Sequence, residues 1–450
     1  MKHLCKLWIV ANLLSFPAIY GQEIYNLQRC LEIGLERNYD IRIIRNDQQI
    51  TDNNRSIGNA GYLPTLNLTT GYAGSLYDRE QKTSTGERIN STGVQDRSVS
   101  ADLGLEWTIF DGLKIQTNYK RLRELQQIGA LNTRLVIEDF ISQLSAEYYN
   151  FVQQKIRLKN LQAAVSLSRE RLRIVEERYN IGSMSRLDLQ QAKVDFNADS
   201  SKLIKQFEVL QTSRIHLNEM MALDDVNKRL IIRDSVIIPN ALLDLEILRD
   251  KTLTTNAGLL LSQKNQTLSS LDYQVIKSRN YPYLRLNAGY GYGLNKYGVG
   301  TYKQQENIGL TYGLTLGFTI FDGMNRRREQ QNAKLQIQNR QLEYERLELG
   351  LKSDLSNIWI AYRNNLELLN LERQNLSTAK ENYEIAIERY KLGDLSGIEL
   401  REAQNSLLEA EERLLLAEYN TKICEISLMQ ISGQAKEYVG TEYFFDKPQP

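Results

Sequence analysis

Histidine and cysteine are nearly absent from this 450-residue chain, which contains two histidines and three cysteines. His3 lies near the N-terminus and His216 lies in a helical pattern, so no histidine cluster is available to bind a metal. Neither a C-x-x-C nor a G-x-S-x-G motif occurs. The sequence therefore predicts no catalytic residue, no cofactor and no metal site, and we expect no enzyme. Beyond Cys5, the two remaining cysteines, Cys30 and Cys424, are either buried thiols or one disulfide between the two ends of the chain.

A charge surplus and a long hydrophobic run are also missing. The formal net charge is +1, which argues against a nucleic-acid partner because such proteins carry an excess of basic residues. Residues 1–21 have the pattern of a secretory signal peptide, with Lys2 and Lys6 before an apolar segment and Ala18 and Gly21 at its end. No later segment reaches 18 consecutive apolar residues, so we expect an exported chain without a transmembrane helix.

Proline is scarce as well. Only six prolines occur, and none lies in residues 112–222 or 323–432. Since proline interrupts helices, these two segments can form long continuous helices. Pro64 and Pro282 stand in matching phrases, Y-L-P-T-L-N-L and Y-P-Y-L-R-L-N, and each phrase opens a strand pattern.

The matching phrases belong to an internal duplication. Trp107 and Phe318 are 211 positions apart, and the same offset relates the segment E-R-Y at 177–179 to E-R-Y at 388–390. We predict a first repeat at 22–226, a linker with a short strand at 227–240, a second repeat at 241–433 and a loosely ordered tail at 434–450. In the first repeat we expect a helix at 26–58, a hairpin at 62–110 with strands at 62–77 and 94–110, and a long helix pair at 112–222. In the second we expect a helix at 241–279, a hairpin at 282–321 with strands at 283–296 and 307–321, and a long helix pair at 325–432.

The predicted strands have one apolar face. From Ile308 to Ile320 every second residue is apolar or aromatic, and the residues between are mainly glycine and threonine. The strand is longer than usual in soluble proteins and close to the about 9–11 residues that cross a bilayer. In a soluble β-sandwich the apolar face would pack inward, but the polar opposite faces suit a wet lumen better. Aromatic residues cluster near the helix-proximal strand ends, as in an interfacial girdle: Tyr62, Trp107, Phe110, Tyr281, Phe318 and Phe321.

Four strands per chain cannot close a barrel, and open sheet edges do not occur in lipid. Several chains must therefore share one barrel. Two chains would give eight strands and a filled interior, whereas three would give twelve strands and room for a conduit.

The long helices carry a seven-residue seam. Leu144, Phe151, Leu158, Val165, Leu172 and Tyr179 are spaced by seven, and adding 211 gives Leu355, Tyr362, Leu369, Leu376, Tyr383 and Tyr390. Such a heptad pattern predicts coiled coils. At ~1.5 Å per residue, the helix predicted to end near Tyr179 would be about 100 Å long.

With these features the chain resembles the outer membrane efflux protein family, the TolC-like channels. The resemblance rests on the duplicated order of two strands, F-D-G and a long helix, on the Y-L-P and Y-P openers, and on the E-R-Y-x-x-G turns. It implies an α+β membrane protein with internal duplication, in which a trimeric 12-stranded transmembrane β-barrel with four strands per chain continues into a long periplasmic α-helical barrel of coiled coils. It also implies a homotrimer in the outer membrane that extends into the periplasm, and coupling to a periplasmic adaptor protein and an inner-membrane transporter.

The resemblance also implies residues around a periplasmic aperture. Glu399 and Glu402 match a ring of acidic residues that would favour cations, and crowding in such a ring would raise the pKa of these carboxyl groups. The alternative is an ordinary acidic first turn of a helix. Asp188 and Tyr390 match aperture-closing contacts. Leu395 stands where the family has an arginine, with Arg186 the nearest substitute. Gly182 and Gly393 match the helix-turn tips that contact the adaptor, and the residues alone suggest helix C-caps.

The expected function is a passive exit duct that conducts small molecules in a tripartite efflux system. Two alternatives stay open at this point. One is an outer membrane duct for type I protein secretion, and the other is a periplasmic coiled-coil scaffold or adhesin with soluble strands.

Overall fold

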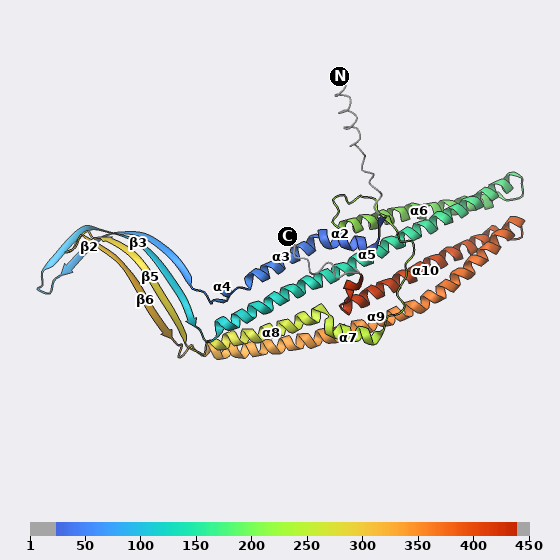
Figure 1. The fold of residues 1–450 in the computed structure, drawn as a ribbon. Coiled ribbons are helices and arrows are strands. Elements are labelled where there is room, and N and C mark those ends of the chain that lie inside the picture. The colour runs from blue at the N-terminus through green and yellow to red at the C-terminus, as the bar shows by residue number, and fades with distance from the viewer. Residues whose placement is uncertain (1–23, 439–450) are drawn as a thin grey trace, which may run out of the picture. The chain divides into compact units, whose positions relative to one another are not determined.

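The computed structural model describes residues 24–438 (Figure 1). The signal peptide predicted at 1–21 and the end of the tail lie outside the described residues. The chain divides into two compact units that cut across the repeats. Among the described residues, one comprises 24–45, 132–260 and 347–438, and the other comprises 46–131 and 261–346. We call them the helical unit and the strand unit. The two longest helices, α5 (Lys114–Asn180) and α9 (Asn325–Leu392), contribute to both.

The strand unit contains one antiparallel sheet of four strands. Each repeat contributes one hairpin: β2 (Thr65–Lys82) with β3 (Arg88–Phe110), and β5 (Tyr283–Lys296) with β6 (Gln304–Gly317). The hairpins join through β3 and β5, so the order is β2-β3-β5-β6, and Figure 1 shows the strands side by side as one curved sheet. In the same unit, the short helix α4 (Ile57–Ala60) precedes the first hairpin and most of α8 (Ala257–Ser278) precedes the second.

The last predicted strand was wrong at its end. We expected it to reach residue 321, but β6 ends at Gly317. The equivalent segment of the first repeat, from Trp107 to Phe110, is a strand because it pairs with β5. β6 pairs only with β5 among the described strands, and β5 begins at Tyr283, which lies opposite Gly317, so Phe318 to Phe321 have no partner that would extend the ladder.

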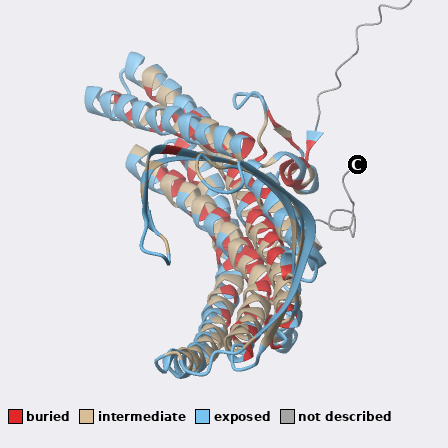
Figure 2. Ribbon diagram, turned by 90° about the vertical axis from the view of Figure 1, so that its left-hand side faces the viewer, coloured by how far each residue is buried: buried red, intermediate tan, exposed pale blue. Residues whose placement is uncertain are grey.

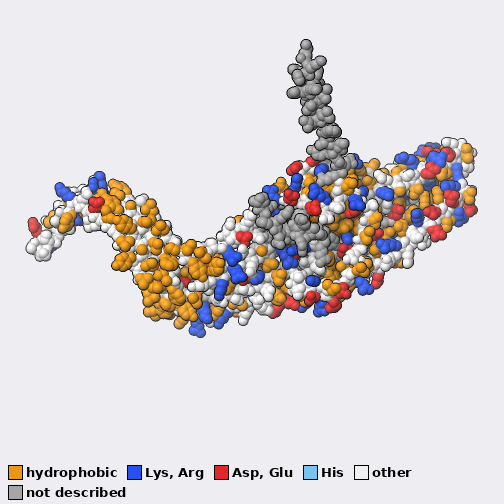
Figure 3. All heavy atoms as spheres, in the orientation of Figure 1, with side chains coloured by type: hydrophobic (Ala, Val, Ile, Leu, Met, Phe, Trp, Pro, Cys, Tyr) orange, Lys and Arg blue, Asp and Glu red, His pale blue; other side chains and the backbone are white. Residues whose placement is uncertain are grey.

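The register of the sheet separates an apolar face from a polar one. One transverse row consists of Leu68, Leu103, Tyr290 and Leu310, and the next row along the strands on the other face consists of Asn67, Gly104, Gly289 and Thr311. The apolar side chains are largely exposed, and in Figure 3 hydrophobic side chains cover the strands. The face therefore does not form the core of a β-sandwich within the described chain.

The core of the helical unit follows the predicted seam. Leu144, Phe151, Leu355 and Tyr362 are buried, and Figure 2 shows the buried residues concentrated in the helices while the strands are mostly exposed. The unit contains most of α5 and α9 together with four helices that belong to it alone: α2 (Leu27–Arg37), α6 (Arg186–Met220), α7 (Leu245–Thr255) and α10 (Gly397–Ile431). None of the helices between residues 24 and 438 is long and apolar enough to cross a membrane.

The helices predicted at 26–58 and 241–279 are both interrupted. The first breaks at Asn38, between α2 and α3 (Tyr39–Asn54), and the second breaks at Asn256, between α7 and α8. The Asn38 amide accepts from the backbone of Asp40 at 2.9 Å and donates to the carbonyl of Met220 at 3.1 Å. Asn256 likewise donates to the carbonyl of Ile431 at 2.9 Å. Each asparagine thus caps a following helix and satisfies a carbonyl at the end of α6 or α10.

The linker and the tail add small elements. The short linker strand was predicted, and β4 (Ile231–Ile232) pairs in parallel with β1 (Ile24–Tyr25). The tail is ordered at its start, contrary to the prediction, because a 3₁₀ turn spans Ala435–Tyr438 and Ala435 is buried. Cys30 and Cys424 are both free thiols, which decides between the two alternatives for them.

Candidate functional site

The two long helix hairpins of the helical unit turn at glycines. Gly182 and Gly393 adopt positive φ angles of 81° and 83°, a left-handed conformation that favours glycine. In the second turn the N–H of Gly393 donates to the carbonyl of Tyr390 at 3.1 Å, and the N–H of Asp394 donates to the carbonyl of Arg389 at 3.0 Å. These two bonds form a Schellman motif, so the helix C-caps predicted here are confirmed.

The returning helices begin with the same device in both repeats. The hydroxyl of Ser185 accepts from the N–H of Asp188 at 3.2 Å, and the hydroxyl of Ser396 accepts from the N–H of Glu399 at 3.2 Å. Each carboxylate in turn accepts from the backbone N–H of its serine. Asp188 and Glu399 are 211 positions apart, so they occupy equivalent positions in the two repeats. Each completes a capping box.

The capping contacts stabilise the charged form of the Glu399 carboxyl. Hydrogen bonds from the backbone N–H and the hydroxyl of Ser396 lower the pKa of this carboxyl below its ordinary value. Within a single chain the shift is opposite to the one expected for a ring of acids. Glu402 lies one helical turn further on, is exposed, and lines a groove of about 230 Å³ together with Glu399, Ile385 and Leu395.

Tyr390 is buried in the apolar cluster near the two helix turns. Its side chain is 0% exposed, and among the described residues its hydroxyl has no hydrogen-bond partner. Burial raises its pKa. The guanidinium of Arg178, from the end of α5, lies 5.2 Å from the centre of the Tyr390 ring and donates to the carbonyls of Tyr390 at 3.1 Å and Lys391 at 2.9 Å. Arg178 therefore caps the end of α9 across the repeats.

Arg178 is a residue that the sequence analysis missed, although its E-R-Y phrase was noticed. Arg186, expected as the substitute for the family arginine, is exposed and forms no ion pair within residues 24–438. Asp188 and Tyr390 line one cavity of about 470 Å³, so the structure brings those two predicted residues together.

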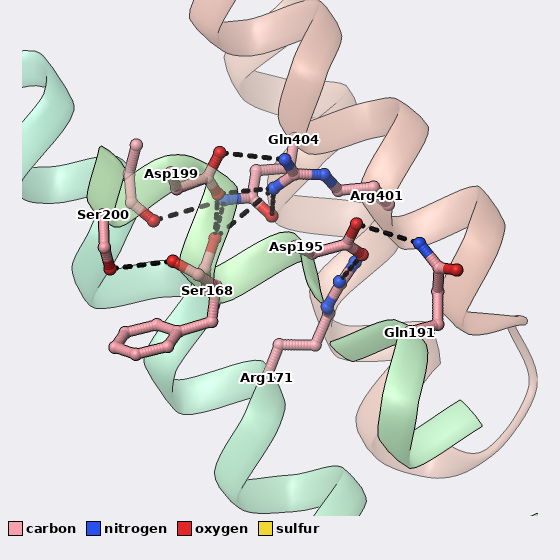
Figure 4. Close-up of polar contacts among 10 residues, drawn as sticks. Ser168, Arg171, Gln191, Asp195, Asp199, Ser200, Arg401 and Gln404 are labelled. Carbon is pink, nitrogen blue, oxygen red and sulfur yellow. Dashed lines mark hydrogen bonds and ion pairs between the residues drawn. The ribbon is translucent and has the colours of Figure 1, made fainter. Parts of the chain in front are cut away.

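Two buried ion pairs lie above the turns, and one of them joins the repeats (Figure 4). Arg401 of α10 donates to both carboxylate oxygens of Asp199 on α6, at 2.6 and 2.9 Å, and the Asp199 side chain is only 2% exposed. The hydroxyl of Ser168 also donates to Asp199, and Gln404 donates to Ser168 at 3.0 Å. Burial acts to raise the pKa of Asp199, but the hydrogen bonds from Arg401 and Ser168 outweigh it, and the pKa is lowered.

The second pair joins Arg171 to Asp195, whose other oxygen accepts from Gln191 at 3.0 Å. The sequence analysis did not find these residues. A signal was present, because Asp199 continues the apolar seam of α6 that runs through Leu189, Ala192 and Phe196. A charged residue at such a seam position needs a buried partner.

The site consists of groups that recognise charge. No group of histidine, cysteine, aspartate and glutamate in the part of the chain that the structure describes has the arrangement of a metal site. The arrangement instead consists of helix caps, an arginine clasp and ion pairs that hold two hairpin tips together.

The chain matches known proteins over almost its whole length. The family model described as outer membrane efflux protein matches residues 31–223 and 248–434. The chain is 21% identical to the outer membrane protein TolC of Escherichia coli (strain K12) over 461 residues, which cover 97% of this chain and 87% of TolC.

Solved structures agree on the fold. The Campylobacter jejuni CmeC outer membrane channel aligns with a TM-score of 0.75 at 17% identity, over 94% of this chain and 90% of CmeC. The outer membrane protein VceC of Vibrio cholerae aligns with a TM-score of 0.74 at 14% identity, over 90% of this chain and 96% of VceC. The predicted resemblance is confirmed: the chain belongs to the outer membrane efflux protein family and is an outer membrane efflux channel.

Proposed function

We propose that three copies of this chain form the exit duct of a tripartite efflux system. In this assembly the four strands of each chain complete a twelve-stranded barrel in the outer membrane, and the long helices form a tube in the periplasm. A periplasmic adaptor and an inner-membrane transporter supply substrate and energy, and the duct conducts small molecules passively. The family matches favour this role over a type I secretion duct or a scaffold.

One observation carries the proposal: the sheet is apolar on one exposed face and unpaired at both edges. Within the described residues no strand pairs with the outer edge of β2 or of β6. Lipid offers no hydrogen bonds to these N–H and C=O groups, so the edges must pair with other chains. Three chains supply twelve strands, enough for an open interior.

The helix turns are the proposed aperture. We assign Glu399 and Glu402 to an acidic ring at its mouth, and Asp188, Tyr390 and Arg186 to the contacts that close it. We assign Gly182 and Gly393, at the exposed tips, to the surface that meets the adaptor. The support is that all seven residues gather at the two hairpin turns of the helical unit.

Extraction of the expressed chain tests the assembly. We expect it in the outer membrane fraction, soluble only with detergent, with a particle mass three times that of one chain, and conducting in planar bilayers. Recovery from the soluble periplasmic fraction as a single chain would contradict the proposal and favour the scaffold. Loss of resistance to small toxic compounds on deletion, with protein secretion unchanged, distinguishes efflux from secretion.

A further inference from the structure

Positive charge gathers at one end of the sheet, where the start of α5, the end of α8 and the start of α9 lie (Figure 1). We call the segments 111–121, 272–282 and 318–329 of these helices and their flanks the basic junction. Together they contain eight lysines and arginines and four aspartates and glutamates. At the opposite end of the sheet, the segments 77–97 and 295–306 contain six and five. The surplus of positive charge is thus larger at the helix-proximal end of the sheet.

Direct contacts hold the three segments of the basic junction together. A Cβ atom added at Gly112, just before α5, would lie 2.3 Å from the carbonyl oxygen of Ser278 at the end of α8, so the two backbones are in close contact. The guanidinium of Arg326 on α9 donates from Nη1 to the carbonyl of Arg279 at 3.0 Å, which joins α9 to the segment after α8. The charges of the three segments therefore belong to one surface.

The four carboxylates of the basic junction all have partners. Asp111 accepts from the backbone N–H of Ile115 at 3.1 Å and so caps α5. The other three form ion pairs with arginines of the junction, in the combinations Arg121–Asp272, Arg326–Asp322 and Arg279–Glu329. The remaining five cations are exposed and form no ion pair within residues 24–438: Lys114, Lys120, Lys277, Arg327 and Arg328. The junction therefore offers cations without carboxylates to neutralise them.

The basic junction begins where the apolar face of the sheet ends. Leu113, Tyr281 and Phe321 belong to the same three segments, and their large apolar side chains are exposed. In Figure 3 hydrophobic side chains cover the strands, and Lys and Arg side chains gather at the edge of that covering, where the helices begin. An apolar face followed by aromatic side chains and then by cations is the order found at a membrane surface. This order places the cations at the level of lipid headgroups.

The location of the chain in the outer membrane identifies the partner by its chemistry. Lysines and arginines close to a membrane surface attract anionic lipids, and this attraction falls off within about one Debye length. The adjacent Arg327 and Arg328 can each bind phosphate oxygens through two parallel N–H groups. Lys120 lies about 9 Å further along α5 than Lys114, so it contributes less than the other four cations.

We propose that the basic junction binds the phosphate groups of anionic phospholipids in the periplasmic leaflet of the outer membrane, through the side chains of Lys114, Lys277, Arg327 and Arg328. This inference rests on the proposed function, since it requires that the sheet crosses the membrane. It adds a lipid partner and the residues that select it. The opposite end of the sheet, where acidic and basic residues nearly balance, makes no such selection.

Trp107 can report which lipid lies beside the basic junction. It shares the apolar row of the sheet with Leu286 and Leu314, and its indole Nε1 donates to the carbonyl of Tyr62 at 2.9 Å. In a chain with Trp359→Phe, Trp107 is the only tryptophan after residue 21. Quenching of its fluorescence by phospholipids with brominated acyl chains therefore measures the lipid in contact with this end of the sheet.

The experiment uses the full chain in vesicles of equal parts phosphatidylglycerol and phosphatidylcholine, with bromine on one lipid or on the other. We expect a preference for phosphatidylglycerol of at least about fivefold, the effect of one cation near an anionic surface, and a decrease as salt is added. A variant with Lys114→Gln, Lys277→Gln, Arg327→Gln and Arg328→Gln should lose the preference. The control removes four exposed charges at the opposite end and should keep it: Lys82→Gln, Arg88→Gln, Lys296→Gln and Lys303→Gln.

The outcomes separate this inference from the proposed function. Equal quenching by the two brominated lipids before any charge is removed would overturn the lipid contact, and this result does not depend on whether a variant folds. Loss of the preference in both charge variants would also overturn it, because overall charge would then be the cause. Removal of the preference by sodium phosphate, but not by sodium chloride at the same ionic strength, would assign the junction to a free anion instead. Quenching by neither lipid would place Trp107 outside the membrane and would overturn the proposed function as well.

Discussion

Arg178 and Arg389 occupy the same repeat position, and they form different contacts. Arg389 bonds to Asp394 in its own turn. The equivalent of Asp394 is the uncharged Ser183, and Arg178 instead donates to the backbone at the end of α9. At residue scale, duplication supplied two arginines, and one neighbouring side chain decides whether each bonds locally or joins the repeats.

The proposed acidic ring predicts the behaviour of an open channel. Replacing Glu399 and Glu402 together with alanine should raise single-channel conductance and abolish block by multivalent cations, because the fixed negative charge at the mouth is removed. Planar-bilayer recordings measure both effects. Glu388→Ala, in the exposed pair with Lys391, is the control. Unchanged block in the double variant would remove these residues from the aperture.

The buried pair predicts a large loss of stability. Asp199→Ala leaves the Arg401 guanidinium, only 15% exposed, without its carboxylate. We expect the free energy of unfolding to fall by about 3–5 kcal/mol. Glu176→Ala disrupts a half-exposed pair with Lys193 and should cost less than about 1 kcal/mol. Denaturant titration of the extracted protein compares the two variants, and similar losses would argue against a buried role for Asp199.

The same pair predicts a dependence on pH. Because the pKa of Asp199 is lower in the folded chain, its contribution to stability is complete above the unfolded value of about 4 and disappears as the pH falls through the folded value. Melting temperatures of wild type should therefore fall more steeply below about pH 4 than those of Asp199→Asn. Parallel curves for the two proteins would assign the acid sensitivity to other carboxyls.

At the scale of elements, the strands are defined by their two faces. Leu314 pairs with Leu286, which pairs with Trp107, whereas the adjacent Thr315 pairs with Arg285. Successive residues of a strand point to opposite faces, so these neighbours distinguish the apolar face from the polar face. The helices before the strands are broken in both repeats by an asparagine that reaches the end of a distant helix.

The face assignment predicts which substitution the membrane tolerates. Leu314→Lys should impair assembly, at a cost of roughly 2–4 kcal/mol near mid-bilayer, because the charge enters lipid. Thr315→Lys, one residue on, places the same charge toward the lumen and should assemble normally. The amount of heat-resistant oligomer in the outer membrane measures both. Equal assembly of the two variants would mean that the two faces do not differ in their contact with lipid, and better assembly of Leu314→Lys would mean that the faces are reversed.

At the scale of the whole molecule, the chain buries ion pairs among its helices and leaves apolar side chains exposed on both its helices and its sheet. The interface between repeats holds the buried ion pair of Arg401 with Asp199, and the buried pair of Arg171 with Asp195 lies beside it within the first repeat. The equivalent positions of Arg171, Asp195 and Asp199 on the second repeat are Asn382, Ser406 and Ala410, which carry no charge. In the proposed trimer, contacts between chains would therefore separate before contacts within a chain.

The unpaired edge of β6 predicts a response to proline. Two single variants, Thr311→Pro and Tyr312→Pro, each remove one backbone N–H of β6. One of these N–H groups points to β5 and the other points away from it. If β6 pairs with the next chain, both variants should lose oligomer, because both N–H groups are needed. If the edge stays free, one of the two should assemble as wild type. Native mass after extraction decides between these results.

The sequence by itself determined the duplication, the seam of the long helices and the two-faced strands. Each is a periodic pattern, and periodicity follows from local helix and strand geometry. What only the tertiary structure decided depends on contacts between distant residues. Asn38 breaks a helix because Met220, 182 residues away, offers a carbonyl. β6 stops at Gly317 because its partner strand β5 begins opposite it, at Tyr283. Arg401 finds Asp199 only when the repeats pack together, and no local pattern encodes that meeting.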